Sequence, residues 1–470
     1  MKNQSTLLAL SLSGIVGVAN AAPTSKPNVI IIFTDDQGFG DLGCYGSPDI
    51  KTPSIDKMAA EGLRLTSFYV STSVSSASRA ALLTGRLNSR NGVPGVFFPN
   101  AEGLSQSEIT LAEALKDQGY TTACFGKWHL GDLGGHLPTD QGFDEYFGIP
   151  YSNDMYIGTY HKFADDVNFR EGYTMELAKE HQKIAKVKQN ARKQILSIVP
   201  LFEDDKIVEY PCDQATTTRR YFDRAIEFID ECKVADKPFF TYITPAMPHW
   251  PLAASEEFLG RSERGLYGDA VEEIDYNVGR LLDYLDENRL SKNTIVIFAS
   301  DNGPATYLDE ADHGSAGVLR GGKFSIYEGG VRVPFIVRWC GKIPSGKSSD
   351  AIAASIDLFP TILHYAGCKE ITHHVDGINV SKFWEKPKRE LRDEYIYVRN
   401  NTGKIEGIRK GEWLYCCKSF GNANKNNKPE LFNIKDDISQ KKNLYDEIPE
   451  KATEMQRLLD ECIERDSQLK

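Results

Sequence analysis

The stretch Asn28-Val-Ile-Ile-Ile-Phe33, followed at once by Thr34-Asp35-Asp36-Gln37-Gly38, decides the fold class. A continuous β-branched run is typical of a strand that is buried on both faces of a mostly parallel sheet. Residues 294–299 repeat this pattern and stop at Ser300-Asp301-Asn302-Gly303. The sequence therefore predicts an α/β fold in which two central strands each end in acidic residues.

Strand and helix patterns alternate along the rest of the chain. Helices are predicted at residues 54–62, 109–119 and 267–288, and further strands at 121–126 and 239–244. These two strands lead to Lys127-Trp128-His129 and to Pro248-His249-Trp250. The alternation predicts a doubly wound sheet that is large, mostly parallel and sandwiched by helices. Residues 171–195 are rich in charged side chains and are predicted to form a helical excursion with a solvated face.

Length and composition set the domain organisation. With 470 residues, the chain is expected to form one large domain and a smaller appendage. We place the large α/β domain at residues 22–385 and a small α+β subdomain at 386–470. This subdomain is expected to hold a short antiparallel sheet, with strands near 394–398 and 412–418, and a terminal helix from about Pro449.

Apolar residues make up 41% of the chain and charged residues 26%, as in globular proteins. The formal net charge of −11 argues against a nucleic-acid partner.

The first residues predict the compartment. Lys2, an apolar run at 7–18 and Ala19-Asn20-Ala21 resemble a signal peptide over residues 1–21, with the mature chain starting at Ala22. The run is too short to span a bilayer, so we expect a periplasmic or secreted protein without stable membrane insertion. The nine cysteines include no C-x-x-C pair, which favours buried or incidental thiols over a disulfide scaffold, although up to four disulfides are possible.

Polar side chains gather at the predicted strand ends. The carboxyl ends of parallel strands meet at one edge of a sheet, where ligands bind. Asp35, Asp36, Asp301 and Asn302 offer hard oxygen donors, which suit Ca²⁺ or Mg²⁺ better than Zn²⁺. A single Asp after a strand is commonly a turn or cap residue. Two similar strand ends favour a metal site instead.

A segment after the first strand carries a specific resemblance. Ser75-Ser76-Ala77-Ser78-Arg79, followed by an apolar turn that ends at Thr84-Gly85, resembles the sulfatase signature. Taken alone it would be a serine-rich helix start. Further motifs at residues 33–38, 126–131, 300–303 and 323–332 fall in the family's order, and those at 148–153 and 264–271 resemble the arylsulfatase A and N-acetylgalactosamine-6-sulfatase branch.

The resemblance implies an alkaline-phosphatase-like fold and a formylglycine-dependent sulfatase. In this family the signature Cys or Ser is oxidised to formylglycine, so the chain resembles the serine-type bacterial carbohydrate sulfatases, in which a maturase converts this serine, here Ser75. Asp35, Asp36, Asp301 and Asn302, together with residue 75, match the ligands of one calcium ion. The implied substrate is a sulfated glycan that carries galactose or N-acetylgalactosamine sulfate.

The resemblance also implies roles for the remaining polar residues. Arg79 would hold the residue 75 diol, and Lys127 and Lys323 would neutralise the sulfate oxygens. His129 matches the base for the diol, and His249 matches the acid that protonates the leaving hydroxyl. Imidazole suits both tasks because its pKa lies near neutral pH.

Substrate contacts are expected at four positions, namely Ser152, Asn153, Trp250 and His313. The pair Asp312-His313 allows a second-metal interpretation, as in phosphatases of this fold, but we favour a place in the substrate pocket.

Two other functions are compatible with the scaffold. A phosphomonoesterase or phosphonate hydrolase would use Ser75 unmodified together with two transition-metal ions. A glycan-binding relative without activity would leave Ser75 unconverted.

Overall fold

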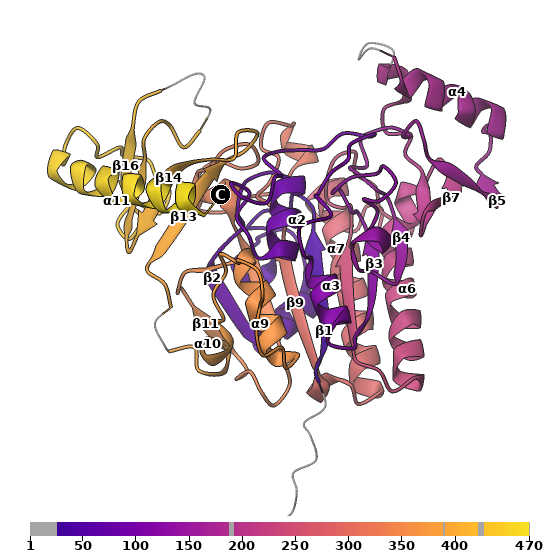
Figure 1. The fold of residues 1–470 in the computed structure, drawn as a ribbon, viewed down its shortest axis with the longest axis horizontal. Helices are drawn as coiled ribbons and strands as arrows, with labels where there is room; N and C mark the ends of the chain where they lie inside the picture. The colour runs from indigo at the N-terminus through magenta and orange to yellow at the C-terminus, as the bar shows by residue number, and fades with distance from the viewer. Residues whose placement is uncertain (1–25, 188–191, 389–390, 422–426, 470) are drawn as a thin grey trace, which may run out of the picture.

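The computed structural model describes residues 26–187, 192–388, 391–421 and 427–469. The predicted signal peptide at 1–21 lies outside these residues. Within the described part, a large sheet of 12 strands lies between two layers of helices, and a separate sheet of four strands packs beside it (Figure 1). The strand order in the large sheet is β11-β2-β10-β9-β1-β8-β3-β4-β6-β7-β5, with β12 paired to β2.

The centre of the large sheet is parallel. Strand β1 (Asn28–Thr34) lies between β8 (Phe239–Thr244) and β9 (Thr294–Ser300), and β3 (Thr121–Gly126) and β4 (Glu145–Gly148) follow beyond β8. Every residue of β1, β8 and β9 is buried, as their continuous apolar runs predict. All five strands point the same way, so their carboxyl ends meet at one edge.

The two sides of the sheet are mixed. Strand β10 (Arg332–Arg338) runs antiparallel between β9 and β2 (Leu63–Tyr69), and β11 (Lys347–Ser349) and β12 (Ala353–Ala354) lie parallel to β2. On the other side, β6 (Leu201–Glu203) is antiparallel to β4 and to β7 (Lys206–Tyr210), which pairs with β5 (Lys162–Phe169). These flanking strands extend the sheet on both sides of its parallel centre.

Helices cover both faces of the sheet. One layer holds α1 (Pro53–Ala60), α6 (Gln214–Val234) and α7 (Gly265–Glu287), and the other holds α2 (Ser75–Thr84), α3 (Leu111–Lys116) and α9 (Leu358–Tyr365). The short elements are α8 (Glu328–Val331), α10 (Ser381–Glu385), and the 3-10 helices η1 (Gly43–Tyr45), η2 (Pro138–Gln141), η3 (Lys193–Ile195), η4 (Ser291–Asn293), η5 (Glu310–Asp312) and η6 (Ser355–Asp357).

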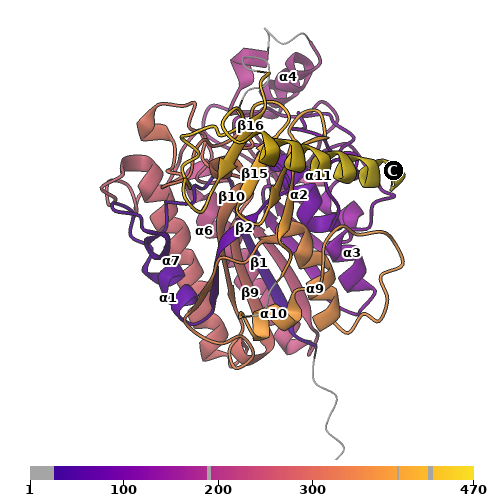
Figure 2. The ribbon, with the colours of Figure 1, turned by 90° about the vertical axis from the view of Figure 1, so that its left-hand side faces the viewer.

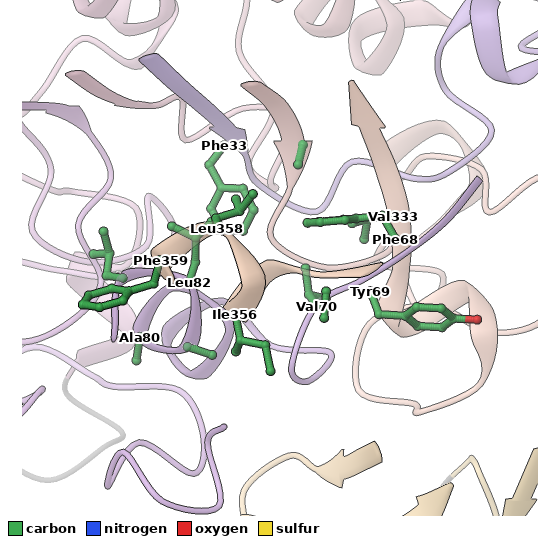
Figure 3. Close-up of a cluster of buried hydrophobic side chains, with 14 of the residues drawn as sticks. Phe33, Phe68, Tyr69, Val70, Ala80, Leu82, Val333, Ile356, Leu358 and Phe359 are labelled. Atoms are coloured by element: carbon green, nitrogen blue, oxygen red, sulfur yellow. The ribbon is translucent and has the colours of Figure 1, made fainter. Parts of the chain in front are cut away.

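Side chains of β1 alternate between the two helix layers, as the period of a strand requires. Ile30 and Ile32 join the core under α6 and α7, whereas Phe33 joins the core under α2 and α9. Figure 3 shows Phe33 in this second core together with Leu82 and Phe359. Burial of each such side chain stabilises the fold by about 1.5–3 kcal/mol. The packing fixes α2, and therefore Ser75, above the end of β1.

Some boundaries differ from the sequence prediction. Helix α3 begins only at Leu111, because the Thr110 hydroxyl caps its first turn and Glu113 completes a capping box. The charged excursion contains a shorter helix than predicted, α4 (Met175–Ala185), whose inner side is buried at Ala178 and His181. Residues 188–191 within it lie outside the described part.

The C-terminal sheet consists of β13 (Glu394–Arg399), β14 (Lys404–Lys410), β15 (Trp413–Cys416) and β16 (Glu430–Asn433), all antiparallel. Helix α11 (Pro449–Gln468) packs across it (Figure 2). The helix starts at the predicted residue, where Pro449 occupies the first turn without costing a hydrogen bond.

All nine cysteines are free thiols in this structure. Among the described residues, no helix has the length and apolar character that a bilayer crossing demands.

Candidate active site

The parallel strand ends bring the predicted site residues together. Asp35 and Asp36 follow β1, Lys127 and His129 follow β3, His249 follows β8, and Asp301 and Asn302 follow β9, while Ser75 and Arg79 lie on α2. All of these side chains are buried. Segments far apart in the sequence are joined by direct hydrogen bonds, such as that between Asn302 and Asp36, which are 266 residues apart.

Ser75 lies at the centre of an oxygen cluster. Its hydroxyl is 3.0 Å from Asp35 Oδ1 and 3.5 Å from Asn302 Oδ1. Asn302 Nδ2 donates to Asp36 Oδ1 at 2.6 Å, and the backbone N–H of Asp36 donates to Asp301 Oδ1 at 3.1 Å. We name Asp35, Asp36, Asp301 and Asn302 the oxygen cluster.

Two residues of the site have left-handed backbone conformations. Asp36 has φ of 56° and His129 has φ of 62°. Such conformations are unfavourable for residues other than glycine and concentrate at functional sites. In the Asp35-Asp36 turn, this conformation allows two consecutive carboxylates to reach the same cluster.

Arg79 is the buried anchor of the cluster. Its Nε and Nη2 donate to Asp301 Oδ2 at 3.1 and 2.9 Å, and its Nη1 donates to the Lys127 carbonyl at 3.0 Å. Nη2 also lies 3.9 Å from Asp35 Oδ1. One guanidinium thereby joins α2 to the ends of β1, β3 and β9.

Two lysines complete the charge balance. Lys127 Nζ contacts Asp35 Oδ2 and lies 3.5 Å from the Ser75 hydroxyl, and Lys323 Nζ donates to Asp36 Oδ2 at 2.8 Å. Burial lowers the pKa of Lys127, although Asp35 opposes this, whereas Asp36 and Asp35 outweigh burial and raise the pKa of Lys323. The charges of three buried carboxylates are thus balanced by three buried cationic side chains. A bound divalent cation would give the site a net positive charge, which would attract an anion.

The carboxyl groups differ in acidity. Burial would raise the pKa of Asp35, but Lys127, His249 and Arg79 outweigh burial and hold it well below its usual range. Burial and the charge of Asp35 raise the pKa of Asp301 to about 7. The cluster therefore holds a proton on one carboxyl below neutral pH, which a bound cation would displace.

His249 is held with one nitrogen toward the cluster. Its Nδ1 contacts the Trp250 carbonyl, which requires a proton on Nδ1, and its Nε2 lies 3.6 Å from Asp36 Oδ2 and 3.4 Å from the Ser152 hydroxyl. Burial, and then the charge of Lys323, lower its pKa. His249 is therefore neutral in the substrate-free protein, with Nε2 available as an acceptor.

His129 has a different environment. Its Nε2 lies 3.0 Å from the Phe97 carbonyl, and its buried Nδ1 has no hydrogen-bond partner among the described residues. Burial and the neighbouring Lys127 hold its pKa well below the usual value. The ring is therefore neutral, and its unpaired nitrogen can accept a proton.

The four predicted substrate residues take different places. Ser152 lies in the centre, 3.3 Å from Lys127 Nζ. Asn153 Nδ2 donates to the backbone carbonyls of His249 and Pro251 at 3.3 and 3.0 Å, so it positions the His249 segment, while its Oδ1 has no partner among the described residues. Trp250 is 44% exposed.

His313 lies in the loop after η5, where its carbonyl accepts from Arg264 Nη2 at 3.1 Å. None of its hydrogen bonds or ion pairs within the described chain reaches the oxygen cluster.

Three residues near the site were not predicted. Tyr307 follows the Asp301 loop, Phe324 follows Lys323, and Asp154 follows Asn153. The ring of Tyr307 lies 5.4 Å from that of Phe324, and Lys323 Nζ lies 5.6 Å from the Phe324 ring, which places both rings beside the site. Phe324 and Asp154 directly follow predicted residues in the sequence, whereas Tyr307 carried no such signal.

The residues present fit a hard divalent cation. Asp35, Asp36 and His249 carry ligand atoms that all lie within 4.8 Å of one another. Calcium prefers oxygen to imidazole nitrogen, and Asp301 and Asn302 add oxygens to the same cluster. The oxygen cluster is therefore the candidate cation site, and His249 is a poorer candidate ligand for a hard cation.

Comparisons with known proteins agree with this geometry. The family model described as "Sulfatase" matches residues 27–368, and "N-sulphoglucosamine sulphohydrolase, C-terminal" matches residues 322–468. Arylsulfatase A of Homo sapiens is 37% identical over 409 residues, which cover 86% of this chain and 75% of the relative. N-acetylgalactosamine-6-sulfatase of Canis lupus familiaris is 38% identical over 393 residues, 80% of this chain and 68% of the relative.

A solved structure is also similar. The crystal structure of Ps i-CgsB in complex with k-i-k-neocarrahexaose has a TM-score of 0.77 and 30% identity, and covers 93% of this chain and 92% of that chain. The first family model spans the whole oxygen cluster and Ser75.

Proposed function

Because the chain belongs to the sulfatase family and is a sulfuric ester hydrolase, we propose that it hydrolyses sulfate monoesters of a carbohydrate through a formylglycine formed from Ser75 and a bound calcium ion. One observation carries the proposal. The Ser75 hydroxyl lies 3.0 Å from Asp35 Oδ1 and 3.5 Å from Lys127 Nζ, so the reacting atom sits where carboxylates and cations meet.

Asp35, Asp36, Asp301 and Asn302, together with residue 75, would hold the calcium ion. When bound, the ion acts as a Lewis acid and a template for the sulfate group. The buried positions of these ligands and the fixed charges of Arg79 support this assignment, because a preorganised site needs little rearrangement during the reaction.

The need for the modified residue follows from simple chemistry. A serine that accepted the sulfuryl group would become a slowly hydrolysed sulfate ester. A hydrated formylglycine supplies two hydroxyls on one carbon, one to take the sulfuryl group and one to expel it as sulfate after deprotonation.

His129 is our candidate for the base that removes this proton. Its Nδ1 has no partner among the described residues, and its lowered pKa keeps it neutral and able to accept. Lys127 lies beside residue 75, with Nζ 3.5 Å from the serine oxygen, and Arg79 supports this lysine because its Nη1 donates to the Lys127 carbonyl at 3.0 Å.

His249 and Lys323 are our candidates for the leaving-group side. His249 Nε2 lies 3.6 Å from Asp36 Oδ2, and Lys323 Nζ bonds the same oxygen. The negative charge of a bound sulfate ester favours the protonated imidazole, which then donates a proton to the departing sugar oxygen. Lys323 retains its proton and screens the sulfate oxygens.

We further propose a substrate that carries galactose or N-acetylgalactosamine sulfate. N-acetylgalactosamine-6-sulfatase is among the relatives, and the similar Ps i-CgsB structure holds a neocarrahexaose. Ser152, at the centre of the site, and the exposed Trp250 are proposed sugar contacts. His313 is proposed to line the outer pocket, and Asn153 to act through the His249 segment. Export and maturation by a formylglycine-generating enzyme belong to the same proposal.

The test measures sulfate release from N-acetylgalactosamine 6-sulfate by protein coexpressed with a serine-type maturase. Ser75→Ala should abolish release, and Ser355→Ala, which alters a buried serine elsewhere, should retain it. Faster release of phosphate from the corresponding sugar phosphate would contradict the proposal and favour the phosphomonoesterase alternative.

A further inference from the structure

Two exposed aromatic rings lie side by side next to Lys323. Tyr307 is 58% exposed and Phe324 is 43% exposed, although both are large hydrophobic side chains. Their ring centroids are 5.4 Å apart with an interplanar angle of 40°, and Lys323 Nζ lies 5.6 Å from the centroid of Phe324. We name Tyr307 and Phe324 the aromatic pair.

The backbone holds Phe324 in an unfavourable conformation. Its φ of 68° lies in the left-handed region, which a bulky residue rarely adopts. Two backbone hydrogen bonds hold the chain just before this α-carbon, because Lys323 N–H donates to the Pro304 carbonyl at 2.8 Å and Phe324 N–H donates to the Ser73 carbonyl at 3.2 Å. An aromatic ring that is displayed at such a position, beside a site residue, points to a function.

The loop that carries Phe324 is anchored by the C-terminal sheet region. Ile326 N–H donates to the Phe420 carbonyl at 2.7 Å, and the Tyr327 hydroxyl donates to Glu430 Oε1 at 2.9 Å. The ring of Phe324 is therefore presented from a loop with fixed hydrogen bonds on both sides. A fixed ring loses little conformational freedom when a ligand binds it.

Tyr307 reaches the same region from a different segment. Its phenol lies close enough to Lys323, Asp36 and Asp154 for their charges to act on it. The rim beside Lys323 thus presents a flat apolar surface made of two exposed rings.

We propose that the aromatic pair is the platform on which the C–H face of the sulfated hexopyranose stacks, on the leaving-group side of Lys323. The inference rests on the proposed function, since Lys323 is there the cation for the sulfate oxygens. A pyranose has a face of C–H groups and a rim of hydroxyls. The face loses water against an aromatic ring, while the hydroxyls of the rim keep their contacts with water or polar groups. With the sulfate beside Lys323, the ring that bears it falls next to Phe324.

The test replaces each ring by a side chain that is apolar but not flat. Phe324→Leu and Tyr307→Leu should each raise the KM for N-acetylgalactosamine 6-sulfate about tenfold, with kcat little changed, whereas Tyr307→Phe should retain the wild-type value. The inhibition constant of inorganic sulfate should stay the same in all variants, because the anion pocket is untouched. Tyr276→Leu is the matched control. Tyr276 lies in α7, is 48% exposed, and pairs with Phe258 at the same 5.4 Å.

A binding measurement separates this inference from the proposed function. In the Ser75→Ala background, which cannot turn over, the Leu variants should bind the same sugar sulfate about tenfold more weakly than their parent. An unchanged affinity of the Leu variants for the sugar sulfate, or an equal loss of their affinity for inorganic sulfate, would overturn the inference that the aromatic pair binds the sugar. Weakening for a disaccharide but not for the monosaccharide would overturn it too, because the rings would then hold a neighbouring sugar. Absence of sulfate release by the wild type would count against the proposed function alone.

Discussion

Replacement of Arg79 by methionine tests the buried charge network. Methionine fills a similar volume but removes both bonds to Asp301 Oδ2, at 3.1 and 2.9 Å, and the bond to the Lys127 carbonyl at 3.0 Å. Removing one partner of a fully buried pair leaves an uncompensated charge and costs about 3–5 kcal/mol. We therefore expect Arg79→Met to lower the free energy of unfolding of the metal-free protein by that amount near pH 8.

The deficit should depend on pH. Burial and Asp35 already raise the pKa of Asp301 to about 7, and loss of the guanidinium removes an influence that lowers it. A carboxyl whose folded-state pKa exceeds its unfolded-state pKa contributes stability at low pH, and this contribution is lost as the pH rises through the folded-state pKa. The loss in the free energy of unfolding caused by Arg79→Met should consequently be smaller at pH 5, where Asp301 carries a proton, than at pH 8.

The assay is urea unfolding of metal-free wild type and variant at both pH values, followed by tryptophan fluorescence. Arg280→Met is the matched control. Arg280 Nη2 lies 2.6 Å from Asp223 Oδ1, but the side chains are 31% and 36% exposed, so solvent screens the pair and its loss should cost about 0–1 kcal/mol. If Arg79→Met lowers the free energy of unfolding by no more than Arg280→Met does at pH 8, the buried charge of Arg79 does not stabilise the folded protein.

Three further predictions concern the reaction. His249→Ala should slow a sugar sulfate by about 10²–10⁴-fold and an activated aryl sulfate much less, because only the poor leaving group needs a proton; equal losses in kcat would remove the acid role. Calcium affinity of the Ser75→Ala protein, measured by calorimetry, should weaken as the pH falls below about 7, since the ion must displace the proton of Asp301; a constant affinity from pH 8 to 5.5 would exclude this displacement. Tyr327→Phe removes the bonds to Glu430 at 2.9 and 3.1 Å that anchor the Lys323 loop, and should cost about 0.5–1.5 kcal/mol of stability together with a several-fold loss in kcat/KM; lost stability with unchanged kcat/KM would contradict the anchoring role.

The sequence predicted the centre of the fold well. The strands β1, β3, β8 and β9 lie within one residue of their predicted bounds, because buried parallel strands have nearly uninterrupted apolar sequences. Their ends could be placed at one edge from the strand direction alone. The oxygen cluster followed from that placement, and the motif resemblance then located Ser75 and Arg79 beside it.

The flanking strands carry weaker signals. Strand β10 contains Pro334, which cannot donate to a ladder and argues against a central strand, and the register with β2 shifts between Val333 and Phe335 around this residue. Arg64 and Thr66 interrupt the apolar run of β2. The positions of β2 and β10 are determined by pairing with neighbouring strands and not by their own sequence patterns.

The outer site depends on tertiary contacts as well. The sequence did not predict that Asn153 donates to the carbonyls of His249 and Pro251, because no local pattern specifies which carbonyl a side chain meets. The aromatic pair has no periodic signal. It arises because the left-handed backbone at Phe324 and the hydrogen bond from Lys323 N–H to the Pro304 carbonyl place the Phe324 loop against the loop that carries Tyr307.

The mass of the peptide that contains residue 75 tests the central claim most directly. For protein produced with a serine-type maturase, we predict that this peptide lacks two hydrogen atoms relative to the encoded sequence, and that sulfate release rises in proportion to the converted fraction. An unmodified serine in protein that cleaves sulfate esters at full rate would contradict the claim.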